Sequence, residues 1–146
     1  MKILLGAQID GDPVAKGRPR ATKDGRVYTP AKTRSWESMA AQILALRWGS
    51  APLLRPVGLS VMAIHARPQS RPKTISRDLW ALGGQLWRPS KPDLDNIVKA
   101  VKDAMEKAGV IANDSQICEV RARKAYAAKG EEPSIIIHLY EIGEEP

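Results

Sequence analysis

Short apolar runs and helix-like repeats alternate along the chain, and their order limits the folds open to it. Four segments predict strands: residues 2–9 (KILLGAQI), residues 57–66 (VGLSVMAIHA), the alternating stretch 118–122, and SIIIHLYEI near the C-terminus. Two segments with helical spacing lie between them. A chain of 146 residues is long enough for one domain with a real core. We therefore predict a single α+β domain over residues 1–146, with a mixed or antiparallel sheet and two main helices.

The two helices are marked by their start and stop signals. Thr29–Pro30 is typical of an N-cap followed by proline at the first helical position, and Gly49 stops that helix. The second helix is expected from about Asn96 to Ala108, with Gly109 as its stop. Its apolar positions recur at helical spacing: Ile97, Val101, Ala104, Met105 and Ala108.

Positive charge is concentrated in two irregular segments of a chain whose formal charge is +7. Residues 15–30 form a basic arm rich in Pro and Gly, and residues 67–90 form a long loop that contains Trp80 and Trp87. The C-terminal segment from Glu131 is acidic instead. Two basic tracts in loops favour a polyanionic partner, and nucleic acid is the commonest one. A solvated surface without a partner is the alternative.

Several classes of protein are disfavoured by what the chain does not contain. No apolar run approaches the ~20 residues that cross a bilayer, and the N-terminal run is too short for a signal peptide. The single cysteine, Cys118, excludes an intrachain disulfide. We expect a soluble cytoplasmic protein with no membrane partner and no small-molecule cofactor. We also expect Cys118 to be a small core residue, and His65 and His138 to be packed on strands.

Two aspartates, Asp93 and Asp95, stand close together in the segment KPDLDNIVK, just before the second helix. Like charges at this spacing repel, so either a cation neutralises them or they cap the helix. Lys99 has a similar ambiguity, because Asp95, Lys99 and Asp103 are spaced four residues apart, as in a surface charge ladder. A third carboxylate, Asp114, lies in the turn after the helix and has to fold back to meet the other two.

The segment from Lys91 to Ile117 resembles the signature of the RusA-type Holliday junction resolvases. The likeness rests on P-D-L-D-N, on a lysine four residues beyond the second aspartate, and on D-S-Q-I. The likeness extends to GDPVAKGRPR, YTPAKTRSWE and SQICEVRARKAY, and so covers nearly the whole chain. One position departs from the family pattern: Asn113 stands where the family often has an aspartate. An amide offers a carbonyl oxygen but no charge, so a direct metal role at this position is in doubt.

The resemblance implies a dimeric endonuclease that nicks branched DNA. Asp93, Asp95 and Asp114 would hold Mg²⁺, with Mn²⁺ as a substitute, through hard oxygen ligands. With Lys99, which would stabilise charge on the phosphate, they form the predicted catalytic set. Lys124 matches a strand lysine of the family. The predicted DNA-binding residues are Lys16, Arg18, Arg20, Lys91, Lys124, Trp80 and Trp87. For the two tryptophans, stacking on unpaired bases competes with packing or dimerisation.

Two other functions remain open at this point. The same fold would serve a non-catalytic basic DNA-binding protein, in which the aspartates only cap and pair. A metal site alone also does not dictate the DNA structure that is cut, so a less selective nuclease of branched DNA is a further alternative.

Overall fold

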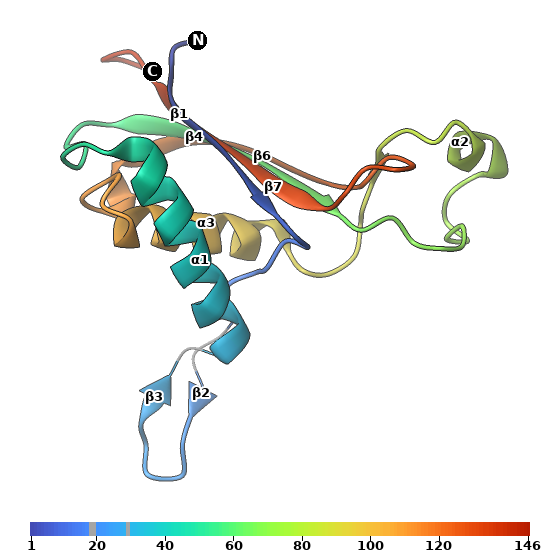
Figure 1. Cartoon of the computed structure of the whole chain (residues 1–146), viewed down its shortest axis with the longest axis horizontal. Coiled ribbons are helices and arrows are strands. Elements are labelled where there is room, and N and C mark those ends of the chain that lie inside the picture. The colour runs from blue at the N-terminus through green and yellow to red at the C-terminus, as the bar shows by residue number, and fades with distance from the viewer. Residues whose placement is uncertain (18–19, 29) are drawn as a thin grey trace.

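A five-stranded mixed sheet forms the frame of the protein (Figure 1). The computed structural model describes residues 1–17, 20–28 and 30–146. Strand order across the sheet is β1-β7-β4-β6-β5. The strands are β1 (Ile3–Asp10), β4 (Val57–His65), β5 (Leu86–Trp87), β6 (Ile117–Tyr126) and β7 (Ser134–Glu141). The predicted α+β class and the mixed sheet are confirmed.

One pair of strands, β4 and β6, runs parallel, whereas the other neighbours in the sheet are antiparallel. A parallel pair needs a crossover connection, and this one contains the helix α3 (Leu94–Lys107). The segment between the end of α3 and the start of β6 lies against α3, where Asp114 contacts Lys99. This topology makes it possible for Asp114 to approach residues of α3.

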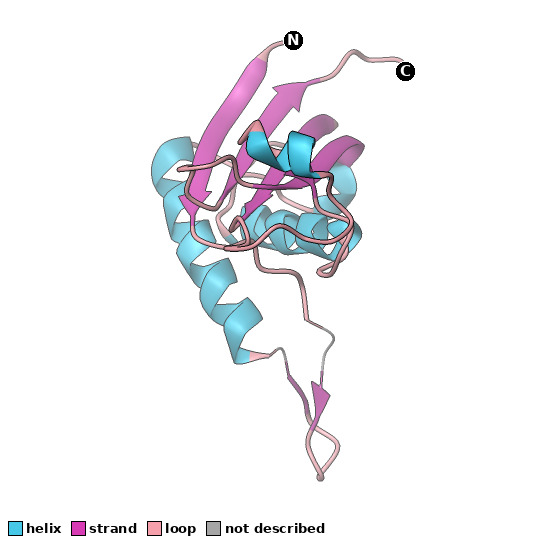
Figure 2. Ribbon diagram, turned by 90° about the vertical axis from the view of Figure 1, so that its right-hand side faces the viewer, coloured by secondary structure: helices cyan, strands magenta, loops and turns pink. Residues whose placement is uncertain are grey.

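The two main helices, α1 (Ala31–Trp48) and α3, pack against each other and cover one face of the sheet (Figures 1 and 2). Trp36 of α1 and Ile97 of α3 belong to one buried cluster with Val61 of β4 and Ile137 of β7. Alternate residues of β4 point to this core, so Met62 points to the opposite face. Gly49 ends α1 in the left-handed conformation, at φ 61°, as a C-terminal glycine does.

Several expectations about irregular segments need correction. The basic arm contains a short hairpin of β2 (Arg20–Ala21) and β3 (Val27–Tyr28), which projects away from the sheet (Figure 1). The long loop contains the helix α2 (Arg77–Ala81) and the strand β5. These elements are too short to produce a recognisable period in the sequence. Pro30 is the N-cap of α1 rather than its first residue, and Thr29 lies outside the described residues.

Cys118 is exposed, so its assignment to the core was wrong. The register between β4 and β6 shifts at this point: Val57 pairs with Ile117 but Gly58 pairs with Glu119. Cys118 is therefore the extra residue of a bulge, where the alternation of inward and outward side chains is interrupted. The predicted packing of His65 is confirmed, since this side chain is buried. None of the described helices combines the length and the apolar character that a membrane span requires.

Candidate active site

Asp93 and Asp95 lie at the exposed start of α3. Asp93 is in the N-cap position, but its carboxylate makes no capping hydrogen bond; only its backbone carbonyl accepts from the N–H of Ile97. Neither aspartate side chain forms an ion pair or a hydrogen bond with another residue in the described part of the chain. Capping by the Asp93 side chain is therefore excluded in this structure, and both carboxylates are available to a ligand.

Lys124 of β6 fixes the turn that leads into α3. Its Nζ donates to the carbonyl oxygen of Ser90 at 2.7 Å and to that of Pro92 at 2.8 Å. The peptide bond between Lys91 and Pro92 is cis. Two of the three ammonium N–H groups of Lys124 are thus used within the protein. This lysine was predicted to contact DNA, and its position shows that it also supports the turn that presents Asp93.

Asp114 begins the short 3₁₀ helix η1 (Asp114–Gln116), which Asn113 caps. The Asn113 Oδ1 accepts from the N–H of Ser115 at 2.9 Å, while Gln116 Oε1 accepts from the N–H of Asn113 at 2.8 Å. The side-chain oxygen at position 113 is therefore engaged in capping. This gives the departure from the family pattern a structural role, and leaves Asp114 as the carboxylate that faces α3.

Lys99 joins Asp114 to the helix. Its Nζ lies 2.8 Å from Asp114 Oδ2 and 3.0 Å from Asp103 Oδ1. The ladder expected from the sequence is thus formed on one side only, towards Asp103. The hydrogen bond from Lys99 lowers the pKa of the Asp114 carboxyl, and hydrogen bonds to Asp114 and Asp103 raise the pKa of the Lys99 ammonium. Both groups are charged at neutral pH.

Lys16, which is predicted to bind DNA, is held between two carboxylates in the structure. Its Nζ lies 2.8 Å from Glu37 Oε1 and 3.1 Å from Asp103 Oδ2, and its backbone N–H donates to the carbonyl oxygen of Asn96 at 2.9 Å. Burial works to lower the pKa of Lys16, but the hydrogen bonds to Glu37 and Asp103 outweigh it and the pKa is raised. Glu37 lies on the buried side of α1 beside Trp36, and an acidic residue at such a position is the sequence feature that indicates a buried cationic partner.

The three predicted metal ligands are only partly assembled. Within the described ranges, no group of three or more His, Cys, Asp or Glu side chains is placed to hold a metal ion. Asp93 and Asp95 are neighbours with open carboxylates, while one oxygen of Asp114 is taken by the Lys99 ammonium. The carboxylate donors suit a hard cation such as Mg²⁺. Asp114 could join them through its Oδ1, for which no side-chain partner is found in the described part of the chain, or through Oδ2 after displacement of the ammonium.

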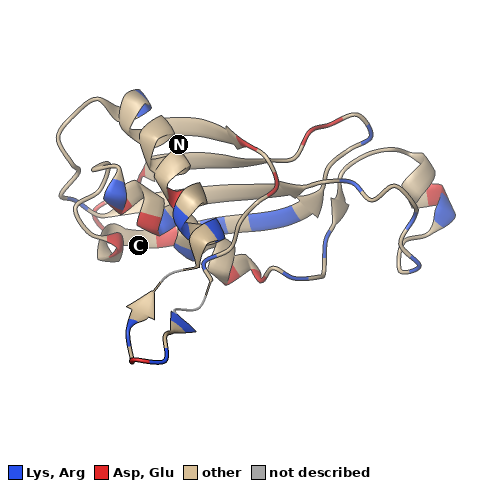
Figure 3. Cartoon of the chain, turned by 60° about the horizontal axis from the view of Figure 1, so that its bottom comes forward, with Lys and Arg blue, Asp and Glu red and all other residues tan. Residues whose placement is uncertain are grey.

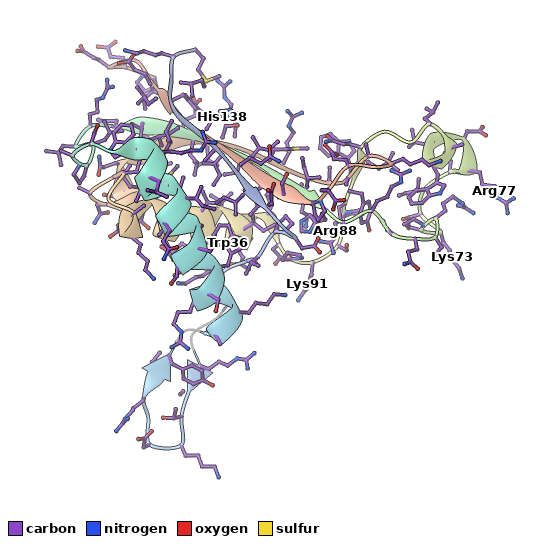
Figure 4. All side chains as sticks on the ribbon, viewed as in Figure 1. Trp36, Lys73, Arg77, Arg88, Lys91 and His138 are labelled. Carbon is purple, nitrogen blue, oxygen red and sulfur yellow. The ribbon has the colours of Figure 1, made fainter. Side chains whose placement is uncertain are left out.

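The remaining predicted DNA-binding residues lie in different surroundings. Lys91 is exposed beside the turn before α3 (Figure 4), and Arg20 is exposed on the hairpin. Arg18 lies outside the described residues. Trp87 exposes 66% of its surface, whereas the Trp80 ring is covered by the Arg67 guanidinium, 3.9 Å from the ring centroid. Trp87 is therefore the tryptophan that is available for stacking.

Lys and Arg residues occur along the hairpin, at the edge of the sheet and in the loop around α2 (Figure 3). Lys73 and Arg77 point outward at the far end of this loop (Figure 4). The open carboxylates at the start of α3 thus lie on a molecule whose surface attracts a polyanion.

Comparison with known proteins relates the chain to a family of endodeoxyribonucleases. Residues 10–140 match the family described as Endodeoxyribonuclease RusA. The chain is 31% identical to the uncharacterized protein YqaN of Bacillus subtilis (strain 168), over 92% of this chain and 94% of YqaN. It is also 31% identical to the crossover junction endodeoxyribonuclease RusA of Aquifex aeolicus (strain VF5), over 78% of this chain and 73% of that protein. The chain belongs to the RusA family.

Proposed function

We propose that this protein is a Mg²⁺-dependent endodeoxyribonuclease that resolves four-way DNA junctions by paired, symmetric nicks in recombination and repair. The observation that carries the proposal is the contact between Lys99 and Asp114 beside the open carboxylates of Asp93 and Asp95, in a chain of the RusA family. The proposal extends to this chain the activity for which the Aquifex aeolicus relative is named, that of a crossover junction endodeoxyribonuclease.

The residues of the site have distinct tasks in this proposal. Asp93, Asp95 and Asp114 hold the cation through carboxylate oxygens, and Mn²⁺ can replace Mg²⁺. When bound, the metal supplies Lewis-acid polarisation of the scissile phosphate and a water of lowered pKa. Lys99 presents a compact positive charge that stabilises negative charge developing on the phosphate. The products are nicks with 5′-phosphate and 3′-hydroxyl ends.

DNA binding is assigned to exposed cations outside the metal site. Arg20 and Lys91 are available for phosphate contacts, and Trp87 for stacking on an unpaired base. Arg18 belongs to the same basic arm in the sequence. A homodimer is part of the proposal, because a four-way junction has to be cut in two opposed strands and a twofold pair of sites matches that symmetry. Sedimentation of the protein as a monomer at micromolar concentration would contradict this assembly.

The test is incubation with labelled four-way, Y-shaped and linear duplex DNA, with and without Mg²⁺. The proposal predicts paired nicks in the four-way junction only, and only with the metal. Equal cutting of the Y-shaped and four-way substrates would favour the less selective nuclease.

A non-catalytic DNA-binding protein is the second candidate, and one observation favours it: Asp114 is already neutralised by Lys99. The two candidates differ in their response to the cation alone. A Mg²⁺ site stabilises the folded state by mass action, so Mg²⁺ should raise the Tm and Asp93→Asn should abolish the rise. A Tm that is insensitive to Mg²⁺, together with junction binding without cleavage, would favour the non-catalytic protein.

A further inference from the structure

Asp103 shares its carboxylate between two lysines. Its Oδ1 lies 3.0 Å from the Nζ of Lys99, and its Oδ2 lies 3.1 Å from the Nζ of Lys16. Because each oxygen accepts from a different ammonium, rotation of the carboxylate would break at least one contact. Asp103 is therefore held in one orientation, and it is the second anionic partner of Lys99 besides Asp114.

The contact of Asp103 with Lys16 is more protected from water than its contact with Lys99. The side chains of Lys16, Asp103 and Glu37 are 23%, 21% and 11% exposed, whereas that of Lys99 is 47% exposed. Lys16 is anchored further by Glu37 and by its backbone N–H on Asn96. Ion pairs of this kind are screened less than exposed ones, so the buried end forms a fixed support for the exposed lysine.

We propose that Asp103 is the positioning residue of Lys99, and that it keeps the ammonium at the site when Asp114 takes up the cation. The inference rests on the proposed function. In the structure Lys99 has two anionic partners, Asp114 and Asp103. A cation on Asp114 weakens the first contact because it repels the ammonium and neutralises the carboxylate, whichever oxygen it binds. The second contact does not involve the predicted metal ligands, and it remains.

Asp103 is not one of the predicted metal ligands, and each of its two oxygens already lies against a lysine ammonium. It lies eight residues beyond Asp95 on α3, which corresponds to about 12 Å along the helix axis. Its role is thus indirect: it contacts Lys99, and Lys99 contacts the reacting phosphate. Neutralising Asp103 leaves Lys16 paired with Glu37 and Lys99 paired with Asp114, so the fold should tolerate the change.

The first test is a mutant cycle on the cleavage rate. Asp103→Asn should lower the single-turnover rate about tenfold to hundredfold, as misplacement of a reacting group does, and change junction affinity less than twofold. In a Lys99→Ala background the same substitution should cost nothing further, because Asp103 acts through Lys99. The slow cleavage by the Lys99→Ala variants can be followed over hours with enzyme in excess.

A matched control separates positioning from helix packing. Lys107 also ties α3 to α1, through a hydrogen bond of 2.9 Å to Ser38 Oγ, but does not touch Lys99. Lys107→Met should keep the wild-type cleavage rate. Lys16→Met removes the contact with Asp103 Oδ2 and should lose part of that rate. A wild-type rate for Asp103→Asn, or an equal loss in the Lys99→Ala background, would overturn the proposal.

The second test does not depend on cleavage. Lys99 is labelled with an amine-reactive ester and quantified by peptide mass spectrometry, with and without Ca²⁺, which occupies carboxylate sites without supporting the reaction. Asp103→Asn should label several-fold faster than wild type in Ca²⁺ and at a similar rate without it, since Asp114 then still holds the ammonium. Equal labelling in Ca²⁺ would contradict the role of Asp103. If the wild type cleaves no DNA, the proposed function fails while this measurement still decides the contact.

Discussion

At the scale of single residues, Lys99 is the side chain whose roles as surface ion pair and as catalytic group make opposite predictions. In the structure it contacts Asp103 and Asp114 but not Asp95, so it connects the helix to the turn before β6. The contact with Asp114 of η1 is not part of the charge ladder on α3 that the four-residue spacing indicates.

Lys99→Ala should therefore fold, bind four-way junctions and lose cleavage by a factor on the order of 10²–10³, the cost of removing a group that stabilises transition-state charge. Lys99→Arg should also be impaired, because a planar guanidinium does not replace a compact ammonium. Single-turnover rates and junction affinities measured side by side test this. Near-normal cleavage by Lys99→Ala, with a small loss of stability, would reduce Lys99 to an ion-pair partner.

His65 gives a prediction about pH. Burial, and then the positive charge of Arg88, lower the pKa of this imidazole to about 4. Its Nδ1 lies 3.0 Å from Arg88 Nη1; since arginine only donates, Nδ1 is the acceptor and His65 is neutral. In the unfolded chain the pKa is about 6.5, so the unfolded state gains the proton first as pH falls.

The contribution of His65 to stability is thus complete above pH 6.5 and is lost as pH falls from about 6.5 towards about 4. Between pH 7 and pH 5 the free energy of unfolding should fall by about 2 kcal/mol through this residue. Urea denaturation at both pH values measures the change. His65→Gln should lose this dependence, while His138→Gln, on the half-buried His138, should retain it. Identical pH dependence in the wild type and His65→Gln would refute the assignment.

At the scale of elements, the sequence predicts a helix or strand correctly where that element is long enough to show a repeating apolar pattern. The helix α3 and the strands β4 and β7 are long enough for their apolar spacing to identify them. The two hairpin strands, α2 and β5 contain two to five residues each, so no period could develop. The bulge at Cys118 depends on strand register, which a single strand does not encode.

The candidate site divides in the same way. The four candidate catalytic residues lie within one short motif, and their prediction rests on that motif: Asp93, Asp95, Lys99 and Asp114. The contacts of Lys16 with Glu37 and Asp103 join three segments that are distant in the sequence. Only the packing of α1 on α3 brings these segments together. The sequence alone therefore does not distinguish Lys16 from the other cations of the basic arm.

The turn before α3 gives a prediction at this scale. Lys124→Met should remove both hydrogen bonds to the carbonyl oxygens of Ser90 and Pro92 and lower the free energy of unfolding by on the order of 1 kcal/mol. Cleavage should fall because Asp93 is less firmly placed. The dependence of junction affinity on salt should stay unchanged, since no phosphate contact is lost. A salt dependence that becomes flatter would instead identify Lys124 as a phosphate ligand.

At the scale of the whole molecule, the proposed function assigns cleavage to the carboxylates at the start of α3 and much of DNA binding to cations on other elements. The exposed cations of the hairpin and the α2 loop lie away from the start of α3, where Asp93 and Asp95 are open (Figures 1 and 3). Binding and cleavage should therefore be separable by substitution.

Arg20→Gln, on the exposed hairpin, should weaken junction binding and reduce the slope of log affinity against log salt by about one. The cleavage rate at saturating protein should be retained. Fluorescence anisotropy over a salt series measures the slope, and Arg47→Gln, at the opposite end of α1, is the control. An unchanged slope would remove the hairpin from the binding surface.

The central claim is that Asp114, brought to α3 by the parallel pairing of β6 with β4, completes a metal-dependent nuclease site with Asp93 and Asp95. The most direct measurement compares the wild type with Asp114→Asn on a labelled four-way junction in Mg²⁺. The account predicts that the wild type makes paired nicks, while Asp114→Asn binds the junction at least as tightly, because a negative charge is removed, and does not cut it. Cleavage by Asp114→Asn at the wild-type rate would contradict the account.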